Sequence, residues 1–167
     1  MQQFQMLFPG GKAKALTLSY DDGVEQDLHL IELMKQHGVK GTFNLNSSLF
    51  APEGTVYPAG QIHRRMSRAQ CREAYDNEYC ELALHGATHS FLQAQPTALA
   101  MHEIITDRRQ MEEMYGRTIR GMAYPYGTYS DSVVDILRLA GVAYCRTTQS
   151  HLNFRLPEDY LRWGATC

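Results

Sequence analysis

The sequence predicts an α/β fold built from parallel β/α units. Short β-rich runs alternate with stretches of helical period along the 167 residues, and this order implies parallel strands joined by right-handed crossovers. Glycines at positions 38, 116 and 141 follow three of the helical stretches, as is typical of helix C-termini. No repeat, low-complexity tract or charge block marks a linker, so we expect one domain over residues 1–167.

Five short segments rich in β-branched and aromatic residues are predicted to be strands. They cover residues 15–20, 41–46, 81–85, 119–124 and 142–147. A loop rich in proline and glycine at residues 51–60 interrupts the otherwise short connections.

Helices are predicted between these strands. They cover residues 24–37, a stretch that begins at residue 67, residues 97–115 and residues 130–140. Ser67 and Gln70 have the spacing of a capping box, and Ser130 can cap the last helix. The longest helix carries Met101, Ile104, Ile105, Met111 and Met114 on one face.

Composition and charge exclude some classes of partner. The formal net charge is -2, so the chain has no basic field, and we expect neither nucleic acid nor a membrane surface as a partner. The cysteines at 71, 80, 145 and 167 form no C-x-x-C pair and are interpreted as small buried side chains. No signal segment or long apolar run is recognised, and a cytoplasmic location is therefore expected.

Polar side chains gather where four predicted strands end. Asp21 and Asp22 follow the first strand, Asn44 to Ser48 follow the second, His85 and His89 follow the third, and Pro125 to Gly127 follow the fourth. The carboxyl ends of parallel strands meet at one rim, where ligands of β/α folds bind. The sequence therefore predicts one site that contains all of these residues.

The residue types at this rim favour a metal site. Two adjacent carboxylates repel each other unless a cation or a proton compensates them. His85 and His89 can both face one ion, and one of the two aspartates completes a set of three ligands with open positions, as in catalytic zinc sites. Alone, an H-x-x-x-H pair is more often two core or surface histidines, and an Asp-Asp pair can be a solvated turn. Their predicted convergence favours the metal.

Four segments of the sequence resemble the motifs of polysaccharide deacetylases that carry the NodB-homology domain. Leu18 to Gly23 resembles T-F-D-D-G, Gly41 to Leu45 resembles the second strand, His85 to Ser90 resembles H-x-x-x-H, and Tyr124 to Gly127 resembles the core of R-x-P-Y-G. The resemblance covers about residues 15–147 in the family's order. It implies a partial or distorted (β/α) barrel and hydrolysis of N-acetyl groups on a sugar or polysaccharide.

The resemblance also implies a role for each site residue. Asp21 becomes the general base, and Asp22, His85 and His89 become the ligands of a divalent metal, most often Zn²⁺. The backbone N–H of Tyr126 would stabilise the oxyanion. Residues expected on the substrate side are Asn44, Tyr124, Pro125 and Trp163, although Trp163 can also be a core residue.

Two departures from the family pattern concern the arginine and the acid. The family's third motif begins with an arginine that orients the base, but Ala123 stands at that position. Arg120 is an odd number of residues away and should face the other side of the strand, so we predict that Arg146 partly replaces the missing group. No L-x-H motif supplies a general acid, and His151 is a weak candidate. We therefore expect the domain to lack its C-terminal portion or a neighbouring chain to complete it as a homo-oligomer.

Three other functions are considered. A signalling receiver domain is disfavoured, because it needs an aspartate and a lysine where this chain has His85 and Arg146. A relative of the same fold that hydrolyses a small cyclic amide without metal is a closer alternative. A sugar-binding pseudoenzyme also fits the presence of Ala123 and the missing acid.

Overall fold

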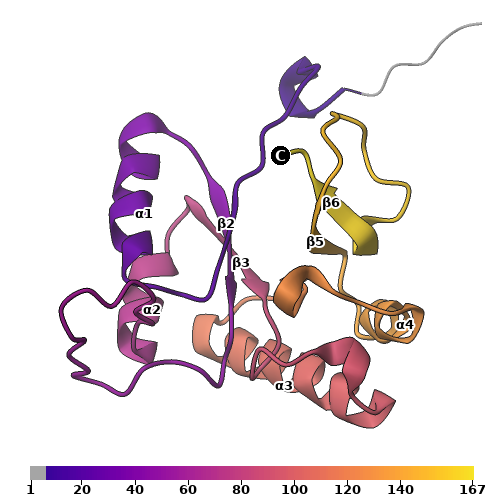
Figure 1. Ribbon diagram of the computed structural model, residues 1–167. Helices are drawn as coiled ribbons and strands as arrows, with labels where there is room; N and C mark the ends of the chain where they lie inside the picture. Colours follow the sequence, from indigo (N-terminus) through magenta and orange to yellow (C-terminus); the bar gives the residue numbers. More distant parts are fainter. Residues whose placement is uncertain (1–6) are drawn as a thin grey trace, which may run out of the picture.

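The computed structural model describes residues 7–167, and strands and helices alternate along them (Figure 1). The strands are β1 (Ser19–Asp21), β2 (Gly41–Leu45), β3 (Cys80–Leu84), β4 (Gly121–Ala123), β5 (Tyr144–Ser150) and β6 (Trp163–Ala165). The α-helices are α1 (Gln26–His37), α2 (Arg68–Tyr75), α3 (Thr97–Tyr115) and α4 (Asp131–Leu139). Short 3-10 turns are η1 (Pro9–Gly11), η2 (Leu92–Ala94), η3 (Pro125–Gly127) and η4 (Tyr160–Arg162).

The six strands form one parallel sheet in the order β1-β2-β3-β4-β5-β6. Strands that follow one another in both sequence and space are typical of a (β/α) barrel, whereas doubly wound sheets reverse their order. The fold is therefore a curled half-barrel of the predicted β/α type, and the helices lie around its outside (Figure 1).

A contact between distant strands shows how strongly the sheet curls. In a flat sheet, β5 would lie about 19 Å from β1, because neighbouring strands are about 4.8 Å apart. Nevertheless, Nε of Arg146 on β5 donates a hydrogen bond of 2.9 Å to Oγ of Ser19 on β1. The two strands therefore face each other across the inside of the curve.

The hydrophobic core lies on the convex side of the sheet, beneath the helices. Alternate strand residues point to this side and are buried, among them Phe43, Leu45, Leu82, Leu84, Met122 and Cys145. The helices contribute Ile31, Met34, Tyr75, Ile104, Met111, Val133 and Leu137. Burial of these side chains is the main force that holds the helices on the sheet.

The concave side of the sheet has a different composition. Its residues are Ser19, Asp21, Thr42, Asn44, Glu81, Ala83, Gly121, Ala123, Tyr144 and Arg146. Polar side chains bond to one another here, as Thr42 does to Glu81 at 2.7 Å. A closed (β/α) barrel fills its interior with branched apolar side chains, whereas this half-barrel has a polar inner face.

The predicted elements are confirmed in their order, but not in every boundary. Residues 97–115 form α3 as predicted, and both bonds of the capping box at Ser67 are present. The first strand is shorter than predicted, because residues 15–17 are exposed and only Ser19–Asp21 pair with β2. Strand β6 was not predicted at all. Of the four cysteines, Cys167 is exposed rather than buried.

Within residues 7–167, no helix is both long and apolar enough to cross a membrane.

Candidate metal and catalytic site

The turn after β1 places two carboxylates side by side at the rim. Asp21 ends the strand, and Asp22 adopts a left-handed backbone with φ of 79°. Such a conformation is uncommon for residues other than glycine and is frequent at functional sites. Gly23 follows with φ of 67°, and an added Cβ would approach the Leu45 side chain to 3.1 Å. The tight turn therefore depends on glycine at position 23.

Asp21 is held by two side chains of the concave face, Arg146 and Asn44. Nη2 of Arg146 contacts both carboxylate oxygens, and its distance to Oδ2 is 2.6 Å. Nδ2 of Asn44 donates to Oδ1 of Asp21 at 2.9 Å and also to Ser19. Because Ser19 accepts from Arg146 as well, these four residues form one connected network around the carboxylate.

Asp22 is held by two side chains of the loop between β2 and α2. Nη2 of Arg65 donates to Oδ1 at 2.6 Å, and Nε2 of His63 lies 3.1 Å from Oδ2. Burial by itself would raise the pKa of Asp22. The positive charge of Arg65 and the contact with His63, aided by the two site histidines, hold that pKa below its usual value. The carboxylate is therefore ionised at neutral pH.

His85 presents one free ring nitrogen to the site. Its Nδ1 lies 2.8 Å from the carbonyl oxygen of Ala123, which can only accept, so Nδ1 carries the proton and Nε2 has a free lone pair. Burial lowers the pKa of His85, which keeps the ring neutral. A hydrogen bond from the far nitrogen to a carbonyl is the usual arrangement of metal-binding histidines.

Asp22, His85 and His89 fit a shared metal ion. Each offers one ligand atom, and these atoms all lie within 4.8 Å of one another. The imidazoles of His85 and His89 and the ionised carboxylate of Asp22 make a set of three ligands that could hold a divalent metal ion. Nε2 of His85 also lies 4.0 Å from Oδ2 of Asp21, so the predicted base borders the same space.

The negative charges of Asp21 and Asp22 are already balanced by protein side chains. Two neighbouring carboxylates were expected to need a cation between them. Instead, each has its own arginine, since Arg146 pairs with Asp21 and Arg65 pairs with Asp22. Support for a metal therefore comes from the geometry and protonation of the histidines rather than from uncompensated negative charge.

Helix α3 anchors the loops that carry the histidines. The buried carboxylate of Asp107 accepts the backbone N–H groups of Ser47 at 2.8 Å and of His85 at 3.0 Å. One turn earlier, Glu103 accepts from both the N–H and the hydroxyl of Thr88. The loops after β2 and β3 are thus tied to one rigid element.

The aromatic rings of Tyr126 and Phe91 lie beside His89. The ring of Tyr126 lies 4.5 Å from that of His89 and stacks on Phe91 at 3.8 Å. The side chains of Tyr126 and Phe91 are each about half exposed. Tyr126 and His89 also have positive φ values, of 59° and 54°. Together with Asp22, they are three of the four non-glycine residues between 7 and 167 with this conformation.

Comparison with known families identifies this arrangement. A model of the family described as polysaccharide deacetylase matches residues 9–145, which is most of the chain and includes Asp21, Asp22, His85 and His89. The chain belongs to the polysaccharide deacetylase family. No curated protein matches the sequence.

Solved structures of polysaccharide deacetylases share the fold. The de-N-acetylase from Aggregatibacter actinomycetemcomitans matches 93% of this chain with a TM-score of 0.74 and 19% identity. The deacetylase domain of BpsB from Bordetella bronchiseptica matches 89% with a TM-score of 0.70 and 20% identity. A CE4 family pseudoenzyme from Bacillus anthracis matches 80% with a TM-score of 0.61 and 17% identity. The chain spans 71%, 68% and 43% of the lengths of these three structures.

Among family-derived expectations, the structure brings Asp21, Asp22, His85, His89, Tyr126 and Arg146 to one rim. Arg120 points elsewhere, as expected, and donates to the carbonyl of Gly141. Pro125 is buried, and its ring lies 3.3 Å from where a Cβ on Gly86 would be. It therefore shapes the loop beside the histidines.

Tyr124 and Asn44 were expected on the substrate side of this deacetylase-family chain, but both are buried. Tyr124 is 2% exposed, stacks on Tyr129 and donates to the carbonyl of Leu161, so it is a core residue of the convex side. Asn44 is 1% exposed and turned toward Asp21. Side chains point alternately to the two faces of a strand, so Tyr124 points away from the inner face. Asn44 lies on the inner face, where it is turned toward the neighbouring strand.

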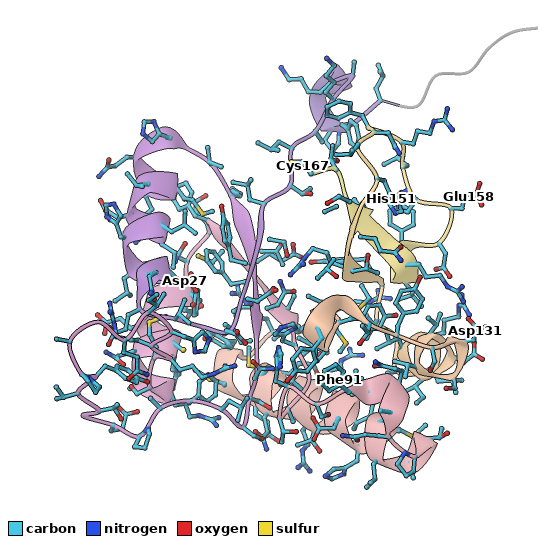
Figure 2. All side chains as sticks on the ribbon, viewed as in Figure 1. Asp27, Phe91, Asp131, His151, Glu158 and Cys167 are labelled. Carbon is cyan, nitrogen blue, oxygen red and sulfur yellow. The ribbon has the colours of Figure 1, made fainter. Side chains whose placement is uncertain are left out.

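Trp163 begins β6, and His151 directly follows the end of β5. Trp163 is half buried and packs edge-on against Tyr144 and Tyr160. His151 packs on Gly164, and Figure 2 shows it beside β6, well away from Phe91 at the rim. The position of His151 gives no support for its role as general acid in this deacetylase fold.

Several residues that shape this deacetylase site were not predicted from the sequence. They are Ser19, His63, Arg65, Phe91, Glu103 and Asp107. For Asp107 a signal existed, because a charged residue falls on the apolar face of α3 between Ile104 and Met111. For Arg65 there was none, since it lies in an irregular loop 43 residues from Asp22.

Proposed function

We propose that this chain is a metal-dependent hydrolase that removes N-acetyl groups from an acetylated sugar or polysaccharide. The single observation that supports it best is the meeting of Asp22, His85 and His89 within 4.8 Å, next to an aspartate held by an arginine. Membership of the polysaccharide deacetylase family makes the acetylated carbohydrate the expected substrate.

In this proposal, Asp22, His85 and His89 hold the ion, with Zn²⁺ as the first expectation from a set of two histidines and one carboxylate. The bound ion would supply an acidified water and polarise the acetamide carbonyl. Asp21 takes a proton from that water. As the C–O bond forms and the C–N bond breaks, this proton passes to the leaving nitrogen, and the products are acetate and a free amine.

Other residues orient these groups. Arg146 and Asn44 fix the Asp21 carboxylate, so that its oxygen stays near Nε2 of His85. The backbone N–H of Tyr126 is proposed to donate to the oxyanion, and the buried Pro125 fixes the loop that carries it. The exposed rings of Tyr126 and Phe91 border the space where a sugar would lie.

The test is acetate release from N-acetylglucosamine oligomers by the purified chain with and without Zn²⁺. Asp21→Asn and His85→Ala should each reduce kcat/KM by about 10²-fold or more, since one removes the general base and the other a metal ligand. Treatment with a chelator should abolish activity, and added Zn²⁺ should restore it. His102→Ala, at an exposed position of α3, is the matched control and should change nothing.

Unchanged acetate release in Asp21→Asn and His85→Ala would reject the proposal. So would full activity of protein shown by metal analysis to contain no stoichiometric divalent ion.

A hydrolase of the same fold that needs no metal is a second candidate. The observation that favours it is the pairing of each carboxylate with its own arginine, which balances the charge of the site without an ion. Hydrolysis of a small cyclic amide by metal-free protein would support this candidate.

A sugar-binding pseudoenzyme is the third candidate. It is favoured by Ala123 at the position of the family's arginine and by a fold similar to that of a CE4 pseudoenzyme. Calorimetric binding of N-acetylglucosamine oligomers without acetate release, in protein that contains Zn²⁺, would establish it.

A further inference from the structure

Arg65 stands against a metal-site carboxylate where a cation would also bind. We propose that Arg65 weakens metal binding at Asp22, so that the site holds its ion in a readily exchangeable form. This inference rests on the proposed function, because it concerns the same three ligands.

One oxygen of Asp22 is shared between the arginine and the site. Oδ1 lies 2.6 Å from Nη2 of Arg65 and 4.0 Å from Nε2 of His89. The carboxylate oxygen that faces the histidine is therefore already bound to a guanidinium. An ion on the same oxygen would be a close neighbour of a full positive charge.

Arg65 cannot turn away easily. Its Nη1 donates to the backbone oxygen of Asp22 at 2.8 Å and to Oδ1 of Asn46 at 3.0 Å. Asn46 is itself buried and donates to the carbonyls of His85 and Gly86. The guanidinium is thus tied to the loop of the first histidine as well as to Asp22, and its side chain is 18% exposed.

The sign of the effect follows from charge. Groups that hydrogen-bond to metal ligands usually accept a proton and make the ligand more basic, as the carbonyl of Ala123 does for His85. Arg65 has the opposite effect. Its positive charge partly neutralises the Asp22 carboxylate, and the attraction of that carboxylate for a metal cation is therefore weaker.

The neighbouring arginine provides a matched control. Arg64 has the same charge, but its Nε donates to Glu25 at 2.5 Å and its Nη1 to the carbonyl of Gln61. Within residues 7–167, its side chain forms no hydrogen bond or ion pair with Asp22, Asn46, His85 or His89. A variant that loses the charge at position 64 therefore shows whether a change in Zn²⁺ affinity is a general electrostatic effect or comes from the contact between Arg65 and Asp22.

The experiment measures the Kd for Zn²⁺ by competition with a chromophoric chelator at constant pH. Arg65→Gln should bind Zn²⁺ about tenfold or more tightly than the wild type, because the charge is removed while an amide remains to contact Asn46. Arg65→Lys keeps the charge and should stay close to the wild type, as should Arg64→Gln. If charge is the cause, the gain in Arg65→Gln should shrink as salt is added.

An equal or weaker affinity in Arg65→Gln would overturn the inference and leave Arg65 as a residue that only positions Asp22. Equal tightening in Arg64→Gln would overturn it as well. Should Arg65→Gln fail to fold, Arg65→Met gives the same comparison. The readout is binding, so absence of acetate release would reject the proposed function without touching this inference, whereas absence of Zn²⁺ binding in all variants would reject both.

Discussion

At the scale of single residues, Arg146 contacts Asp21 although Ala123 stands where the related motif has an arginine. The family motif that this chain resembles has an arginine on the fourth strand, and here that position holds a methyl group. Ala83 and Ala123 leave the concave face free of bulk, so Arg146 can extend from β5 to Asp21 on β1. The contact is present although the motif is not.

Removal of Arg146 is predicted to impair the base. In Arg146→Ala, Asp21 keeps only its bond from Asn44, and a base that is displaced by about 1 Å can lose about 10²-fold in rate. Arg146→Lys should recover only part of this loss, since an ammonium does not reproduce the two directions in which the guanidinium donates to Asp21 and Ser19. The measurement is kcat/KM for acetate release.

Two further variants sharpen this prediction. Arg120→Ala removes an arginine that bonds to Gly141 rather than to the site, and its activity should be unchanged. Ala123→Arg combined with Arg146→Ala should recover activity, because the new guanidinium starts from the strand that the family uses. A double variant as inactive as Arg146→Ala would argue that the route across the concave face, not the charge alone, is required.

The sequence predicted the groups that carry chemistry better than the groups that hold them. Asp21, Asp22, His85 and His89 follow strands whose ends meet, so the rule for parallel sheets was enough to bring them together. Arg65 is brought to Asp22 by an irregular loop, and no period in the sequence indicates that contact. Asn44 was assigned to the correct rim, but the structure shows it turned toward Asp21.

At the scale of elements, α3 fixes the loops of the site from the convex side. Asp107 is fully buried and accepts the N–H groups of Ser47 and His85. Burial raises the pKa of this carboxyl to about 7, although the two hydrogen bonds act in the opposite direction. Its contribution to stability must therefore change between acid and neutral pH.

We predict a pH-dependent effect of Asp107→Asn. An amide has one acceptor oxygen for the N–H groups of Ser47 and His85, and the His85 N–H also donates to the carbonyl of Leu45 at 3.0 Å. The substitution therefore removes one hydrogen bond, at a cost of about 0.5–1.5 kcal/mol. In the wild type, a folded pKa near 7 exceeds the usual value of 3.8. The stabilisation from Asp107 is thus complete below about pH 4 and is lost as the pH rises through 7.

Urea unfolding at pH 5 and at pH 8 checks this sign. The destabilisation caused by Asp107→Asn should be larger at pH 5, because asparagine does not titrate. A difference in unfolding free energy that is equal at both values, or larger at pH 8, would contradict the burial effect. Glu113→Gln, at an exposed position near the end of α3, serves as the control and should show no such dependence.

The elements themselves were predictable to the extent that their periods were clear. Helix α3 has nineteen residues and one apolar face, and its bounds were predicted correctly. The first strand was predicted too long, because residues 15–17 alternate like a strand but are exposed, and the pairing with β2 begins only after them. Strand β6 has only three residues, Trp163–Ala165, and so short a segment carries no period.

At the scale of the whole molecule, the half-barrel separates stability from chemistry. Its apolar core is buried between the convex face and the helices, while the candidate site and its ion pairs are on the concave face and the rim. Neighbouring residues of one strand therefore serve different purposes. On β4, Met122 is fully buried in the core, whereas Ala123 lies on the concave face beside Arg146 of the neighbouring strand β5.

Paired variants on the two faces should therefore show opposite behaviour. Met122→Ala should lower the free energy of unfolding by about 2–5 kcal/mol, because it leaves a cavity in the core. Arg146→Ala breaks an ion pair whose side chains are 23% and 34% exposed, and such partly solvated pairs contribute about 1 kcal/mol or less. Urea unfolding measures both changes, and acetate release below the unfolding transition should be kept in Met122→Ala and lost in Arg146→Ala. If Arg146→Ala instead unfolded as readily as Met122→Ala, the contact between β5 and β1 would be what keeps the sheet curled, and loss of activity in that variant would report the fold rather than the base.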